Sequence, residues 1–161
     1  MSILVLGLGN TIMTDDGFGV KVVTTLSSRY HFQGPVQLLD GGTLGLDLLP
    51  YLEEIESLLI IDALDMRDEP GKIFRLEGDE VPRAFASKLS VHQMGLQDLL
   101  AVAQLQGHVP RNLVVWGVQP ECIEMHTELT ATVAAAVEPV VAKVLEELEG
   151  WGIEYETIVE T

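Results

Sequence analysis

The sequence has little positive charge and no long apolar run. Its 161 residues contain 9 Lys and Arg against 25 Asp and Glu, so the formal net charge is −16. Nucleic-acid binding depends on Lys and Arg side chains that neutralise phosphates, and an anionic membrane surface attracts the same side chains. Both are therefore excluded as partners. No apolar run approaches the roughly 20 residues that a membrane-spanning helix needs, so we expect no membrane insertion.

Cysteine is almost absent. Cys122 has no second cysteine with which to form an internal disulfide. The N-terminus also lacks the basic start, apolar core and small-residue cleavage site of a secretory signal. We therefore expect a reducing, cytoplasmic location, and we expect Cys122 to be a buried, inert thiol.

The apolar residues follow two patterns, continuous runs and helical spacing. Continuous apolar runs typical of strands buried on both faces occur at residues 3–8, 36–40, 58–62 and 112–118. Apolar residues at helical spacing predict helices over residues 17–30, 44–52, 93–106 and 128–149. The Asp15-Asp16 pair stands where an N-cap and a first-turn acid favour the start of the 17–30 helix. Pro139 predicts a kink in the last helix.

Alternation of strands and helices indicates an α/β fold. We predict a single three-layer domain over residues 1–149, with a mostly parallel, twisted sheet of about five strands and helices on both faces. Residues 72–76 mix polar and apolar side chains and follow a connection at Pro70-Gly71 that is too short for a helical crossover. They therefore predict an antiparallel edge strand. Residues 150–161 are expected to form a partly disordered C-terminal tail.

Polar residues follow the predicted strands at the positions where ligands bind in open α/β sheets, beyond the carboxyl ends of the parallel strands. Asp16 follows the first strand, Asp62 ends the third, and His92 starts a predicted helix. If the strands are parallel, these three side chains can meet at one edge of the sheet. The other strand ends carry the segments Asp40-Gly41-Gly42-Thr43 and Gln119-Pro120-Glu121.

Two carboxylates and one imidazole form a ligand set that suits Zn, Ni, Co or Fe and leaves coordination positions open. Each residue alone also has a structural interpretation. Asp16 could cap a helix, Asp62 could stabilise a strand-end turn, and His92 could begin a helix. Their joint placement at strand ends makes a functional site competitive with these structural interpretations, and His126 could reach the same edge.

Two other chemistries are poorly supported. The segment Gly7-Leu8-Gly9 has two glycines of a dinucleotide-binding loop, but Ile12 stands where the third glycine is needed and two carboxylates follow. No serine lies in the Gly-x-Ser-x-Gly context of an α/β hydrolase. The strand-end acids and His92 therefore remain the leading candidates.

The motifs, and their order along the chain, resemble those of the hydrogenase maturation endopeptidases. The resemblance spans residues 3 to about 149 and rests on Leu6-Gly7-x-Gly9-Asn10, Thr14-Asp15-Asp16-Gly17-x-Gly19-Val20, Asp40-Gly41-Gly42-Thr43, Ile61-Asp62-Ala63, Ser90-Val91-His92-Gln93 with Gly95-Leu96, and Gly117-Val118-Gln119-Pro120-Glu121.

The resemblance implies a function. Such proteins remove a short C-terminal extension from the large-subunit precursor of a nickel–iron hydrogenase after nickel insertion, cutting just after the histidine or arginine that follows the last metal-binding cysteine motif. The metal contacts of the family map onto Asp16, Asp62 and His92, and some members carry glutamate at the first of these positions. The nickel is expected to be supplied by the nickel-loaded precursor and not held by the resting enzyme.

The attacking group stays open, with Asp16, Asp40 and Asp62 as candidate catalytic residues. Gly41, Gly42 and Thr43 are expected to contact substrate, because glycine permits close approach of a peptide backbone. A tight turn at the glycines, capped by Asp40, is the structural alternative. Two alternatives also remain: a metallopeptidase that holds its own zinc, and a non-catalytic module that senses metal and binds the precursor.

Overall fold

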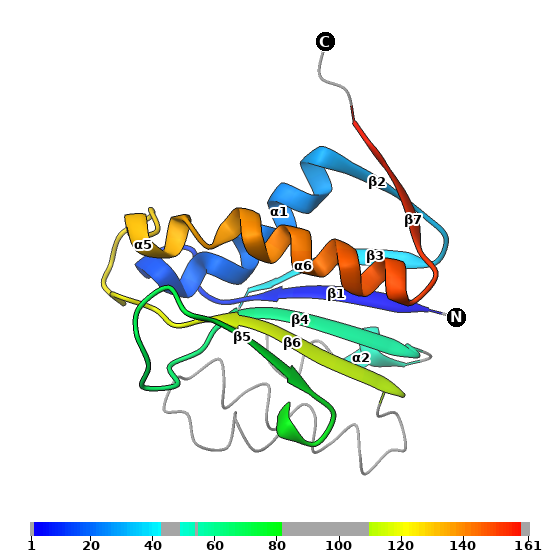
Figure 1. The fold of residues 1–161 in the computed structure, drawn as a ribbon, viewed down its shortest axis with the longest axis horizontal. Coiled ribbons are helices and arrows are strands. Elements are labelled where there is room, and N and C mark those ends of the chain that lie inside the picture. Colours follow the sequence, from blue (N-terminus) through cyan, green and yellow to red (C-terminus); the bar gives the residue numbers. More distant parts are fainter. Residues whose placement is uncertain (1, 43–48, 54, 82–109, 159–161) are drawn as a thin grey trace.

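A computed structural model describes residues 2–42, 49–53, 55–81 and 110–158 (Figure 1). Its main sheet has five strands in the order β3-β1-β4-β6-β5. The strands are β1 (Ile3–Leu8), β3 (Val36–Gly42), β4 (Ser57–Ala63), β5 (Ile73–Glu77) and β6 (Asn112–Val118). Neighbouring strands are parallel except for β5, which runs antiparallel to β6 at the edge. The predicted α/β fold and its antiparallel edge strand are confirmed.

Helices cover the sheet on both faces. The long helices α1 (Phe18–Arg29) and α6 (Val137–Gly150) lie on one face together with α5 (Ala131–Ala134), and α2 (Leu49–Leu52) lies on the other (Figure 1). Side chains of a strand alternate between the faces. Ile3 and Val5 accordingly join the core beneath α1 and α6, whereas Leu4 and Leu6 join the core that includes Leu52.

The predicted helix over residues 128–149 is two helices. Residue Thr130 caps α5, with its hydroxyl oxygen accepting a hydrogen bond from the Val133 N–H, and α6 begins separately at Val137. The predicted kink at Pro139 is wrong. Pro139 lies in the first turn of α6, where a backbone N–H has no intrahelical partner and its loss costs little.

The predicted tail contributes a strand. Residues Glu154–Thr157 form β7, which pairs antiparallel with β2 (Tyr30–Gln33) in a separate two-stranded sheet. The rings of Tyr30 and Tyr155 meet edge to face with centroids 5.4 Å apart, and both pack against the core beneath α6. Partial disorder is therefore a wrong prediction for these residues.

The Asp15-Asp16 pair does not cap α1. Both residues lie in a short 3-10 helix, η1 (Thr14–Gly17), and Gly17 precedes α1 without a side-chain capping hydrogen bond. The predicted helix over 93–106, and all of the 44–52 helix before Leu49, lie outside the described residues. Within the part of the chain that the structure describes, no helix is both long and apolar enough to cross a membrane.

Candidate functional site

The loop after β1 is packed tightly onto the carboxyl-end edge of the sheet. A Cβ atom on Gly19 would lie 2.1 Å from the carbonyl oxygen of Ile61, so only glycine lets the start of α1 approach β4 this closely. Gly9 has a φ of +122°, and a Cβ there would lie 1.7 Å from the carbonyl oxygen of Asp16. The first approach holds the start of α1 against β4, and the second folds the loop of residues 9–17 closely onto itself.

Asp16 lies in η1, the part of this loop that touches β4. Its Oδ2 accepts a hydrogen bond from the backbone N–H of Asn10 at 3.0 Å, and the residue is half-buried. The segment that carries Asp16 is therefore in contact with the strand that carries Asp62.

Asp62 lies near the carboxyl end of β4, the central strand of the sheet, and is fully buried. Its Oδ1 accepts a hydrogen bond from the Ala63 N–H at 2.8 Å, which orients the carboxylate. Its place in the alternation puts it on the same face as Leu58 and Ile60, away from α1. A buried carboxylate is costly unless its partners compensate for lost water, so burial here marks a specialised position.

Asp40 lies on the opposite face of the sheet. It pairs in register with Gly7, and a Cβ on Gly7 would lie 2.5 Å from the carbonyl oxygen of Gly19 in α1. Its Oδ1 accepts from the Gly42 N–H at 3.0 Å, as expected if Asp40 stabilises the glycine turn, and its side chain is exposed. Asp40 and Asp62 thus both lie near the carboxyl ends of their strands, but on opposite faces of the sheet.

The predicted substrate-contacting segment begins inside β3. Gly41 is buried, and Gly42 has a φ of +51° and accepts a hydrogen bond at its carbonyl from the Gly9 N–H at 2.9 Å. The loops after β1 and β3 are therefore joined through glycine backbone. Thr43 and His92 lie outside the described residues. Among the described residues, no three His, Cys, Asp or Glu side chains are grouped closely enough to hold a metal ion.

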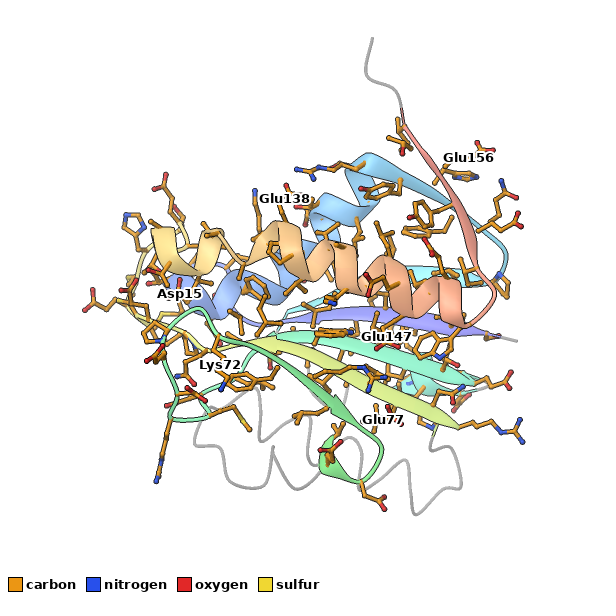
Figure 2. The ribbon with its side chains drawn as sticks, in the orientation of Figure 1. Asp15, Lys72, Glu77, Glu138, Glu147 and Glu156 are labelled. Carbon is orange, nitrogen blue, oxygen red and sulfur yellow. The ribbon has the colours of Figure 1, made fainter. Side chains whose placement is uncertain are left out.

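Asp15 has a structural role that the sequence did not reveal. It is fully buried at the end of the molecule where α5 lies (Figure 2). Oδ1 accepts from the backbone N–H of Thr130 at 2.8 Å, and Oδ2 accepts from those of Glu121 and Cys122 at 2.9 and 3.0 Å. The Thr130 hydroxyl donates to the same carboxylate. Asp15 therefore holds the loop after β6 against the loop after β1.

Thr14 adds a second set of bonds between these loops. Its hydroxyl donates to the Glu124 carbonyl and accepts from the Glu124 N–H, and its own N–H donates to the His126 carbonyl at 2.9 Å. Thr14 has a φ of +48°, a conformation that side chains other than glycine rarely adopt. The hydrogen bonds to the second loop compensate for that backbone strain.

Gln119 organises the loop after β4. Its side chain is buried, and its Oε1 accepts from the N–H groups of Met66 and Asp68 at 2.7 and 3.2 Å. Its Nε2 donates to Asp65 at 3.0 Å. The sequence places Gln119 at a strand end but carries no sign of this positioning role, because its partners lie 51 to 54 residues away.

Cys122 and His126 both lie on the loop after β6. Partial burial, followed by the neighbouring Glu124 carboxylate, raises the pKa of Cys122, so the thiol stays protonated at neutral pH. Its side chain is half-buried, not fully buried as expected. His126 is exposed and forms an isolated bridge with Met13, and its Nδ1 accepts from the Glu128 N–H at 3.1 Å.

Comparison with known proteins gives a consistent result. The sequence model of the hydrogenase maturation protease family (HycI) matches residues 20–147. The hydrogenase 2 maturation protease of Escherichia coli K12 is 42% identical over 155 residues, covering 96% of this chain and 94% of that protein. The hydrogenase expression/formation protein HupD of Rhodobacter capsulatus is 42% identical over 154 residues, covering 94% of this chain and 73% of that protein.

Solved structures agree with the sequence matches. The hydrogenase maturating endopeptidase HybD from E. coli superimposes with a TM-score of 0.95 at 41% identity, covering 98% of both chains. The [NiFe] hydrogenase maturation protease HybD from Thermococcus kodakarensis superimposes with a TM-score of 0.75 at 30% identity, covering 92% of this chain and 99% of that chain.

Proposed function

The chain belongs to the hydrogenase maturation protease family, and from this premise we propose its substrate and its dependence on metal. It removes the C-terminal extension of a nickel–iron hydrogenase large-subunit precursor after nickel has been inserted. The nickel arrives with the precursor, as part of the substrate. The reaction takes place in the cytoplasm, a reducing setting that suits a chain with one cysteine.

The observation that carries this proposal is the fully buried carboxylate of Asp62 at the carboxyl end of the central strand, beside the η1 segment that carries Asp16. Hydrogen bonds from backbone N–H groups orient both carboxylates. Carboxylate oxygens together with an imidazole nitrogen suit nickel as ligands. Asp16, Asp62 and His92 are accordingly the residues that contact the nickel of the precursor.

Such a site makes cleavage depend on the state of the substrate. A precursor without nickel lacks the contact that distinguishes it from a loaded one, so the enzyme binds the loaded form better. The three ligands thereby serve to inspect the precursor before it is cut.

Hydrolysis requires an activated water and a polarised scissile carbonyl. Nickel in the substrate supplies Lewis acidity, and a carboxylate acts as general base. Asp16, Asp40 and Asp62 are the candidates for that base. Gly41, Gly42 and Thr43 at the neighbouring strand end contact the substrate backbone.

The direct test is to incubate the protein with nickel-loaded and nickel-free precursor and to weigh the products by mass spectrometry. We expect loss of the C-terminal extension only from the loaded precursor. Equal cleavage of both forms contradicts nickel inspection. Cleavage that instead requires zinc bound to the enzyme identifies a zinc metallopeptidase, and binding without cleavage identifies a non-catalytic module.

Substitutions test which residues belong to the site. Asp62→Asn and His92→Ala are expected to lower cleavage by at least about 100-fold, since loss of a group that merely supports a metal ligand already costs 10–100-fold. Asp79→Asn is the matched control, because Asp79 is an exposed aspartate outside the site. Circular dichroism checks that each variant folds. Wild-type cleavage by a folded Asp62→Asn variant removes Asp62 from the site.

A further inference from the structure

Three large apolar side chains are exposed on the two loops that Asp15 and Thr14 join. Ile12 lies on the loop after β1, and Ile123 and Met125 lie on the loop after β6. Their exposed fractions are 51%, 46% and 82%. Exposed apolar side chains that gather in one place mark interaction sites, whereas scattered ones are common on any surface.

Backbone hydrogen bonds bring the segments that carry these side chains together. Met13 and His126 form a parallel bridge, with the His126 N–H donating to the Ile12 carbonyl at 3.0 Å. The Thr14 N–H donates in turn to the His126 carbonyl at 2.9 Å, so the two loops lie side by side at this point. Ile12 therefore lies next to the backbone that carries Met125, and Ile123 lies two residues before Met125 on the same loop.

Acidic side chains alternate with these apolar ones on the loop after β6. Glu121, Glu124 and Glu128 on the same loop are all exposed. No lysine or arginine occurs in residues 9–17 or 119–130. We call the three apolar and three acidic residues the paired-loop surface.

A groove continues this surface along α1. Its volume is about 430 Å³, and its lining includes Thr11, Thr14, Thr127 and Glu128 from the two loops and Val20, Lys21 and Thr24 from α1. The groove gives an extended segment a place to lie next to the loop that carries Asp16. The paired-loop surface is also held rigid, because Asp15 and Thr14 fix both loops by hydrogen bonds. A preformed surface loses little conformational entropy on binding.

We propose that the paired-loop surface is where the hydrogenase precursor docks, through a segment of apolar side chains flanked by lysine or arginine. The inference rests on the proposed function for the identity of the partner. The apolar centre provides affinity, and the glutamates select a basic segment and speed its association. Docking here brings the precursor to the edge of the sheet where Asp16 and Asp62 lie.

The test measures binding and cleavage separately. Nickel-loaded precursor is titrated against wild type and Met125→Glu by biolayer interferometry, and KM and kcat are measured on the same proteins. We expect Met125→Glu to raise Kd and KM at least about 5-fold with little change in kcat, since loss of an interface contact that matters costs about 1 kcal/mol or more and 1.4 kcal/mol is a factor of ten. The matched control is Ile158→Glu, because Ile158 is 44% exposed and follows β7, a strand that lies apart from α5 and the paired-loop surface (Figure 1).

Charge reversal provides a second, independent variant. Glu128→Lys is expected to weaken binding and to reduce its dependence on ionic strength, whereas Glu154→Lys on β7 is expected to leave both unchanged. Wild-type Kd for both Met125→Glu and Glu128→Lys overturns the docking inference. If wild type binds through this surface but cuts no precursor, the docking inference stands and the proposed function falls.

Discussion

Replacement of Asp15 by alanine is expected to destabilise the whole chain, because one buried carboxylate joins two loops. Three backbone N–H groups donate to it, from Glu121, Cys122 and Thr130, at 2.8 to 3.0 Å. The Thr130 hydroxyl is a fourth donor. Alanine at position 15 leaves all of these donors without their acceptor.

The size of the effect follows from the donors. An unsatisfied buried donor costs about 1–3 kcal/mol. Glu121, Cys122 and Thr130 are only partly covered, so water replaces part of each lost bond and the lower limit applies. Three N–H groups then give a loss of about 3 kcal/mol in the free energy of unfolding. Asp15→Asn keeps one acceptor oxygen and is expected to cost about half as much.

Urea denaturation measures this loss as a lower midpoint with an unchanged slope. Thermal unfolding gives a second measure, because 1 kcal/mol shifts Tm by about 2–4 °C in a domain of this size. Asp15→Ala is therefore expected to lower Tm by about 6–12 °C. Asp79→Ala, at an exposed aspartate, is the control and is expected to stay within about 0.5 kcal/mol of wild type. If Asp15→Ala is as stable as Asp79→Ala, the carboxylate does not hold the loops together.

Three smaller experiments test other parts of the structure. Gly19→Ala is expected to cost more than about 3 kcal/mol in urea denaturation, because its Cβ would lie 2.1 Å from a β4 carbonyl oxygen. Gly150→Ala, with open space around the Cβ, is its control and is expected to be neutral or stabilising. Glu138, which Figure 2 labels on α6, accepts two hydrogen bonds from Arg29, and these lower its pKa. Glu138→Gln is therefore expected to lower stability above pH 4.5, and this loss is expected to vanish as the pH falls through the lowered pKa of folded Glu138. Burial raises the pKa of Cys122, so its alkylation by iodoacetamide is expected to reach half its maximal rate at a higher pH than that of free cysteine measured alongside. An equal or lower midpoint contradicts the burial argument.

The register of the sheet separates residues that the sequence groups together. Asp40 and Asp62 both follow apolar runs, and both were expected at one edge. Both do lie at that edge, but Asp40 shares a face with Gly7 and Asp62 shares the opposite face with Ile60. Only the pairing of each strand with β1 distinguishes them, because side chains alternate between faces with a period of two residues.

The sequence by itself determined the α/β fold, the extent of the buried strands and the carboxylates at their ends. Each of these follows from a pattern within a few consecutive residues, such as the apolar run of β6 or the aspartate that closes β4. These local patterns are visible in the sequence because a strand buried on both faces requires a continuous run of apolar residues.

Tertiary structure alone decided the pairing of β2 with β7, the division between α5 and α6, and the role of Asp15. β2 pairs with a strand more than 120 residues away, and the hydrogen-bond partners of Asp15 lie 106 to 115 residues from it. A contact between such distant residues leaves no periodic trace in the chain. It forms because buried carboxylates and backbone N–H groups must find partners wherever the fold brings them together.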